Sequence, residues 1–383
     1  MENNFKTCTR CVMNTSDTNL TFDENGVCDR CRDYEERILP WWKHGCGHEE
    51  ELKKLLSDIK RSGEGKPYDC LLGLSGGLDS SYMLHMAVKE WGLRPFAFHI
   101  DAGWDLPVTT ENLDKMQKKL GIKIHVEKMD WDEMRRMQIA FFKTGLSGLD
   151  VPQDHAFIAL VDHFADKMNI KYILNGYNVA TEVVADPASW FVGCGPTADK
   201  TYVKDVLKKN GNVKVKNYVW TTGFKHKIWL PYVKGVKTVT PLNLLPLTRQ
   251  QMIDTLAKEY GYEFYGQKHF EDEITKFIEG YWNIKRFGQD IRIAWLSSLV
   301  ITGQMTRDAA LKELSTPPLP KMKSVRCLRM LPVNSRSAKK SCKGIWICLL
   351  NLANIGIMLG RINWGSNYLL FSDWIIESEN KQS

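Results

Sequence analysis

A loop rich in glycine and serine, Ser75-Gly76-Gly77-Leu78-Asp79-Ser80-Ser81, carries the strongest chemical signal of the chain. It follows an apolar run that predicts a strand, and it opens a predicted helix. Its glycines let the backbone approach a ligand closely, and the free N–H groups of such a turn bind phosphate oxygens. Ser75, Ser80 and Ser81 add hydroxyl donors, and Asp79 suits Mg²⁺ that bridges phosphates. We therefore predict a phosphate site here rather than a plain turn with a helix cap.

Four cysteines near the N-terminus form two Cys-x-x-Cys pairs, Cys8 with Cys11 and Cys28 with Cys31. This spacing is typical of structural zinc, which four thiolates hold tetrahedrally. Such a site has no open position, so we expect it to fold an N-terminal module rather than to catalyse. Free cysteines are the alternative to a zinc site. Disulfides are not expected, because the N-terminus carries no secretory signal and the expected compartment, the cytoplasm, is reducing.

Two later strand ends also present polar side chains. Asp101 follows the predicted strand 95–100, and Asn178, Thr181 and Glu182 follow the predicted strand 171–176. Ligands of parallel sheets bind outside the carboxyl ends of the strands, so these residues are candidates to complete a magnesium–phosphate site. A turn or a helix cap is the competing interpretation for each of them.

Short apolar runs alternate with amphipathic helical patterns from residue 68 onward. The predicted strands and helices form a βαβαβ series, which is typical of the α/β class with a doubly wound parallel sheet. We predict four parts: a zinc-knuckle module over 1–48, an α/β domain over 66–245, a helical substrate region over 246–316, and an atypical tail over 317–383.

The formal net charge of +7 is concentrated in that tail. Residues 314–372 contain nine Lys or Arg and no acid, which leaves 42 basic and 42 acidic residues in 1–313. The neutral body argues against a nucleic-acid partner. We interpret the tail as the product of a shifted reading frame, which sequencing the gene would test. A nucleic-acid arm and a membrane anchor are the alternatives, but only 17 uncharged residues separate Lys343 from Arg361, and we predict no membrane span.

The glycine-serine loop resembles the PP-loop of the ATP pyrophosphatase superfamily, and no Walker motif occurs in the chain. This resemblance implies an adenine nucleotide alpha hydrolase-like fold, and an enzyme that transfers AMP from ATP to a carbonyl or amide oxygen. It implies ATP and magnesium as cofactors, with Asp79 and Ser75 as catalytic residues. The nucleotide-binding residues would then be Ser75, Gly76, Gly77, Asp79, Ser80, Ser81, Asp101, Asn178 and Glu182.

The chain also resembles the N-acetyl sugar amidotransferase family of surface-polysaccharide biosynthesis over residues 5–316, but not in the tail. The resemblance rests on CTRCVMNTSDTNLTFDENGVCDRC, LLGLSGGLDSSYMLH, HIDAGW, ILNGYNVATE, GQKHFEDEITKF and KRFGQDIRIAWLSSLVITGQMTRDAAL. It implies a carbon–nitrogen ligase that adenylates the acetamido oxygen of a nucleotide-linked sugar and replaces it with ammonia, as in lipopolysaccharide or O-antigen biosynthesis. Candidate contacts for anionic substrate groups are Lys268, His269, Lys285 and Arg292, unless these are solvated charges on helical faces.

The source of ammonia is not evident in the chain. Position 2 is Glu2 rather than a cysteine nucleophile, and Cys194 lacks the glycine two residues before it that a nucleophile elbow needs. We therefore expect a separate glutaminase subunit as partner, or free ammonia. The alternative function is a PP-loop tRNA thiolase, which would want a basic surface, a lysine in the loop where Leu78 stands, and a catalytic cysteine near the cleft.

Overall fold

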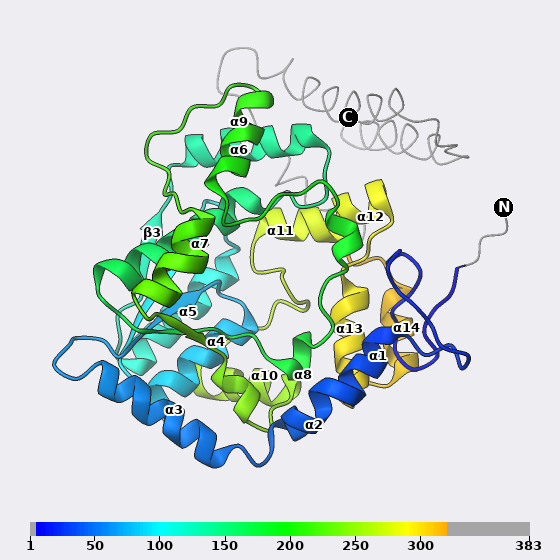
Figure 1. Ribbon diagram of the computed structural model, residues 1–383, viewed down its shortest axis with the longest axis horizontal. Coiled ribbons are helices and arrows are strands. Elements are labelled where there is room, and N and C mark those ends of the chain that lie inside the picture. The colour runs from blue at the N-terminus through cyan, green and yellow to red at the C-terminus, as the bar shows by residue number, and fades with distance from the viewer. Residues whose placement is uncertain (1–4, 320–383) are drawn as a thin grey trace, which may run out of the picture. The chain divides into compact units, whose positions relative to one another are not determined.

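The computed structural model describes residues 5–319, which lie within the first compact unit of the chain, Met1–Cys327 (Figure 1). Apart from its first three residues, the predicted atypical tail over 317–383 lies outside the described residues. No helix within 5–319 combines the length and the apolar character needed to cross a bilayer.

Five parallel strands form one sheet in the order β3-β2-β1-β4-β5, which confirms the predicted α/β class. The strands are β1 (Cys70–Leu74), β2 (Pro95–Asp101), β3 (His125–Lys128), β4 (Tyr172–Leu174) and β5 (Lys237–Val239). The central strand β1 pairs Leu72 with Ala97 of β2 on one side and with Leu174 of β4 on the other. Because β1 and β4 are neighbours while β2 and β3 extend the other way, the strand order reverses beside β1. Ligands of open α/β sheets bind at such a switch point.

Helices cover both faces of the sheet, as a parallel sheet requires. On one face, Leu72 and Leu74 share a core with α4 (Leu78–His85), α5 (Pro107–Leu120) and α10 (Arg249–Tyr260). On the other face, the ring of Phe98 packs against Phe157 and Phe164 of α7 (Val151–Lys167). The remaining helices are α1 (Asp29–Asp33), α2 (Leu39–Trp42), α3 (Glu49–Ser62), α6 (Trp131–Thr144), α8 (Val179–Glu182), α9 (Lys200–Lys209), α11 (Glu273–Phe277), α12 (Asn283–Phe287), α13 (Arg292–Ile301) and α14 (Arg307–Leu314).

The cysteine-bearing N-terminal segment packs against the C-terminal helices, and Figure 1 shows α1 beside α13 and α14. All four cysteines of the two pairs share a hydrophobic core with residues of α8 and α13, such as Val179 and Ile293. The backbone N–H of Val12 also donates to Ser297 Oγ of α13 at 3.2 Å. The two ends of the described chain therefore stabilise each other.

Candidate functional site

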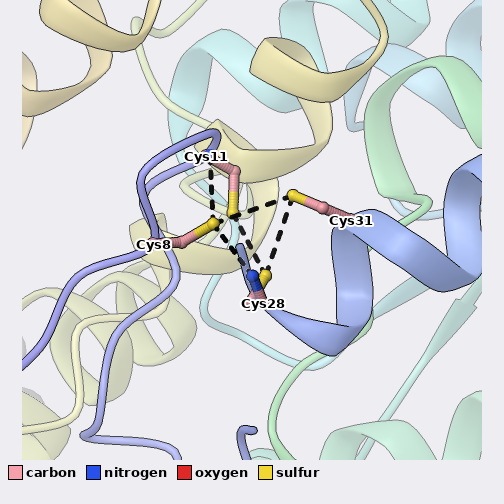
Figure 2. A group of neighbouring side chains, drawn as sticks. All are labelled: Cys8, Cys11, Cys28 and Cys31. Carbon is pink, nitrogen blue, oxygen red and sulfur yellow. Dashed lines mark hydrogen bonds between the residues drawn. The ribbon is translucent and has the colours of Figure 1, made fainter. Parts of the chain in front are cut away.

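The four cysteine thiols lie together, as Figure 2 shows. All are buried, and their sulfur atoms lie within 4.8 Å of one another. The Sγ–Sγ distances are 3.6 Å for Cys11–Cys28, 3.7 Å for Cys28–Cys31 and 3.9 Å for Cys8–Cys31. Sulfurs at the corners of a tetrahedron with the usual Zn–S distance of ~2.3 Å stand ~3.8 Å apart. The four thiols therefore fit one tetrahedral zinc ion.

Backbone groups and one arginine hold this cluster in place. Cys8 Sγ accepts N–H bonds from Arg10, Cys11 and Cys28 at 3.3–3.4 Å, and such bonds stabilise a thiolate. The guanidinium of Arg307 on α14 donates to the carbonyl oxygens of Cys8 and Cys11 at 2.8–3.0 Å. Zinc binding would therefore stabilise the contact of the N-terminal module with the C-terminal helices.

Changing Cys8 or Cys28 to serine is expected to remove bound zinc and to lower the Tm by several degrees, because three thiolates no longer close the tetrahedron. Elemental analysis and thermal unfolding of the purified variants would measure both effects. Cys46→Ser is the matched control, since Cys46 is exposed and lies outside the cluster. A Cys8 variant that still holds one zinc per chain would contradict the assignment.

The predicted phosphate loop, residues 75–81, joins β1 to α4. Gly76 has a φ of +84°, and a Cβ there would come within 2.2 Å of the Thr109 side chain, so the turn requires glycine. The Ser75 hydroxyl accepts the N–H of Gly77 at 3.1 Å and lies 3.2 Å from the Ser80 hydroxyl. Ser81 is fully buried, so it lies beneath the loop rather than at its open side.

Three charged side chains meet at this loop. The ammonium of Lys268 lies 3.1 Å from Asp79 Oδ2 and also contacts Glu182 Oε1. Asn178 donates to Asp79 Oδ1 at 2.9 Å, while its own Oδ1 caps α8 by accepting from Thr181. Burial alone would lower the pKa of Lys268, yet the two carboxylates raise it. Because Asp79 and Glu182 converge on one cation, they are also placed to share Mg²⁺ once the lysine moves.

The close approach of two strand ends brings these groups together. The turn after β4 touches the start of α4, and a Cβ on Gly176 would lie 2.9 Å from the carbonyl carbon of Asp79 and 3.0 Å from the N atom of Ser80. Glycine alone fits between two backbones at this distance. Asn178 and Glu182 thereby reach Asp79, although about a hundred residues separate them in the sequence.

A cleft of about 490 Å³ opens over the phosphate loop, a size that suits a nucleotide. Predicted site residues that line it are Ser75, Gly77, Asp79, Ser80, Thr181, Glu182, Lys268 and His269. Its wall also includes Arg249, Tyr265 and Glu271, which the sequence analysis did not single out. A Cβ on Gly77 would lie 3.0 Å from Glu271 Oε1 and 3.3 Å from the Tyr265 hydroxyl, so both residues face the loop.

Arg249 is a cation at this wall, and no described residue pairs with its charge. Its guanidinium lies over the rings of Phe264 and Trp295, 5.0 and 5.5 Å from their centroids. Within residues 5–319 its side chain forms no hydrogen bond or ion pair; only its backbone N–H is bound, by Gln304. A guanidinium held on aromatic faces keeps all its donors available for phosphate oxygens.

Six predicted site residues do not line the cleft. Gly76 and Ser81 belong to the phosphate loop and Asn178 contacts it, whereas Asp101, Lys285 and Arg292 have other roles. Asp101 ends β2, and its carboxylate accepts the N–H of Gly103 at 3.0 Å. This bond agrees with the competing interpretation of Asp101 as a turn residue. Lys285 is exposed on α12. Arg292 is buried, and its guanidinium binds Asp290 and the carbonyls of Glu313, Leu314 and Thr316. Arg292 therefore closes the end of α14, because its donors satisfy the last carbonyls of that helix.

His269 continues the cleft towards a group of acids. Its Nδ1 lies 3.1 Å from Glu279 Oε1. Burial lowers the pKa of His269, but the charge and hydrogen bond of Glu279 outweigh that effect and raise the pKa to about 10. Burial raises the pKa of Glu279 itself to about 7, and it raises the pKa of Asp150 and Asp186 as well. His269 and Glu279 are therefore both charged between about pH 7 and pH 10.

Changing Glu279 to glutamine is expected to lower the pKa of His269 from about 10, because the largest charge that opposes the effect of burial is removed while Glu271 remains. In the parent chain, the raised pKa of His269 contributes stability that is lost as the pH rises through about 10; in the variant this contribution is smaller and is lost at a lower pH. Titration of the histidine ring signals by NMR measures the shift. Glu127→Gln, beside exposed His125, should leave His269 unchanged. An unaltered pKa of His269 in the Glu279 variant would refute the pairing.

Comparisons with known proteins identify two family domains. Residues 271–330 match the family described as LPS biosynthesis protein WbpG-like, C-terminal domain. Residues 69–145 match the phosphoadenosine phosphosulfate reductase domain, and this segment contains β1, the phosphate loop, β2 and β3. Glu271, the first residue of the first match, lines the same cleft as the loop that the second match contains.

Individual relatives match smaller parts or match loosely. Subunit 2 of sulfate adenylyltransferase from Streptomyces lavendulae is 31% identical over 86 residues, which is 22% of this chain and about a quarter, 27%, of that protein. The NMN synthetase of Francisella tularensis aligns over 58% of this chain and 98% of its own, with 14% identity and a TM-score of 0.27. On the loop, the sheet and the two family matches, the chain belongs to the PP-loop ATP pyrophosphatase superfamily and carries a WbpG-like C-terminal domain.

Proposed function

We propose that this chain adenylates the acetamido oxygen of an N-acetyl sugar, which is nucleotide-linked, and replaces that oxygen with ammonia to give an acetamidino sugar. The observation that carries the proposal is the composition of the cleft. A PP-loop forms one wall, and Glu271, the first residue of the WbpG-like match described for lipopolysaccharide biosynthesis, lines the same cleft. A PP-loop enzyme uses ATP, and the WbpG-like match supplies the link to surface glycans.

The chemistry needs two transfers. The amide oxygen attacks the α-phosphorus of ATP, the bond to the bridging oxygen breaks, and pyrophosphate leaves. Ammonia then adds to the imidate carbon, AMP departs with the former amide oxygen, and the surplus proton leaves the nitrogen. An amide oxygen is a poor leaving group until it carries AMP, so the adenylation step accounts for the use of ATP.

Residues of the cleft suit the first transfer. The N–H groups of the phosphate loop and the guanidinium of Arg249 are placed for the pyrophosphate oxygens, since they flank the same space. Asp79 and Glu182 would hold magnesium, which neutralises phosphate charge when bound. The ammonium of Lys268, released from these carboxylates, remains within reach of the phosphate undergoing attack.

Ammonia is proposed to come from a separate glutaminase subunit. The described residues place neither Cys46 nor Cys194 among the residues that line the cleft. The synthetase and glutaminase reactions would then reside on two chains.

The test is pyrophosphate release from ATP with Mg²⁺ and ammonium, measured with a panel of nucleotide-linked N-acetyl sugars and with bulk tRNA. Release that depends on one sugar, with an acetamidino product found by mass spectrometry, supports the proposal. Release that depends on tRNA instead would overturn it in favour of a tRNA thiolase.

A further inference from the structure

A short helical segment, Lys225–Val233, exposes an unusual number of large apolar side chains. Exposure is 80% for Tyr232, 65% for Phe224, 58% for Val233 and 45% for Ile228. Ile228, Tyr232 and Val233 follow Phe224 by four, eight and nine residues. In a helix with i→i+5 hydrogen bonds, this spacing places all four side chains on the same side. We call these four side chains the Phe224 face. Exposed large apolar side chains gathered on one side of a segment indicate an interaction site.

The opposite side of the same segment belongs to the cleft. His226 lines the cleft, and its Nδ1 lies 2.9 Å from the buried carboxylate of Asp162. Leu230 is buried beneath the segment. One helical segment therefore separates the cleft from the Phe224 face, and a molecule bound to that face lies next to the reaction site.

The charge around the Phe224 face has one sign. Residues 206–253 contain eight Lys and one Arg but no Asp or Glu. Lys225 and Lys234 pair with Asp166, whereas Lys227 and Lys237 are exposed and, among the described residues, form no ion pair. A second copy of the chain would bring lysines against lysines. The C-terminal segment 320–372 also carries Lys and Arg without acids, so its charge does not complement the face.

We infer that the Phe224 face docks the ammonia-supplying glutaminase subunit, through an apolar patch with an acidic rim on that subunit. The inference rests on the proposed function, because a subunit that delivers ammonia must sit beside the cleft. An apolar centre with a charged rim is the arrangement of energetically strong interfaces. A bilayer is the competing occupant of a basic segment with an apolar face, and the vesicle experiment below tests it.

The test uses the full chain and each glutaminase encoded in the same genome, purified separately. In the double variant Phe224→Ser/Tyr232→Ser, the Kd of the complex should rise at least tenfold and glutamine-driven product formation should fall in parallel. Ammonium-driven activity should stay within twofold of the parent chain, because neither side chain lines the cleft. Val126→Ser removes a comparably exposed apolar side chain from β3 and is the control.

Charge is tested by Lys227→Glu/Lys237→Glu, which should weaken the complex most at low salt. Full glutamine-driven activity in the Phe224/Tyr232 variant would overturn the docking assignment. The assignment would also be overturned if the parent chain sedimented with phosphatidylglycerol vesicles and the double variant did not, since the Phe224 face would then bind membranes. If no ammonium-driven activity occurs in the parent chain, the proposed function fails, whereas the Kd still decides whether this face binds a glutaminase.

Discussion

Replacing Asp79 with alanine is expected to lower kcat for pyrophosphate release by about 10²–10³-fold, the range seen when one group that stabilises transition-state charge is removed. Asp79 is the residue on which Lys268, Asn178 and the phosphate loop converge. Without it, Glu182 alone remains to hold magnesium and to position Lys268. Rates would be measured with saturating ATP, Mg²⁺ and ammonium, on variants whose Tm matches the parent chain.

Asp101→Ala is the matched control for this experiment. Asp101 also follows a strand of the sheet, but its carboxylate binds the N–H of Gly103 and does not line the cleft. Its loss should change kcat by only a few-fold. Equal losses in the two variants would mean that Asp101 contacts the nucleotide, and an active Asp79→Ala variant would exclude Asp79 from catalysis.

Replacing Arg249 with glutamine is expected to lower kcat/KM for ATP by about 10–10²-fold. A hydrogen bond to a charged group contributes roughly 1.5–3 kcal/mol, and the glutamine amide retains donors but no charge. Burial lowers the pKa of Arg249, and an anionic ligand would offset that cost of burying its charge. Steady-state kinetics and the inhibition constant of inorganic pyrophosphate would show whether Arg249 binds the leaving group.

Arg286→Gln separates this role from a structural one. Arg286 also lies over two aromatic rings, Trp282 and Phe287, at 5.3 and 5.5 Å, but it lies outside the cleft lining and donates to the carbonyl of Gly145. That variant should lose stability and keep its KM for ATP. If Arg249→Gln and Arg286→Gln both lose only stability, Arg249 has no role in phosphate binding.

Local patterns were sufficient for several features of this protein. The spacing of the four cysteines predicted one cluster because a tetrahedral thiolate site constrains its own ligands. The phosphate loop was evident since strand, glycines and helix follow one another without a break in the chain. The strands β1, β2 and β4 were located by their apolar runs, whereas β5 was missed: it has three residues, mostly exposed, and so shows no apolar signal.

Arg249 illustrates a signal that was only half readable. Thr248 and Gln251 form a capping box, which the sequence pattern Thr-x-x-Gln could have indicated, and it places Arg249 in the first turn of α10. The pattern says nothing about which cleft that helix end faces. Arg292 is a case in which the sequence suggested a role that the structure does not support. Its charge suggested a substrate contact, but its guanidinium donates to carbonyl oxygens at the end of α14.

The sequence by itself determined the α/β class, the phosphate loop, the four-cysteine cluster and the superfamily, because each depends on residues close together in the chain. Only the tertiary structure decided that Lys268 meets Asp79 across 189 positions, that Arg249 faces the phosphate loop, and that the cysteine cluster packs on α13 and α14. These contacts follow from how the helices pack on the sheet and on one another. Packing depends on shape and burial over the whole domain, which no short stretch of sequence encodes.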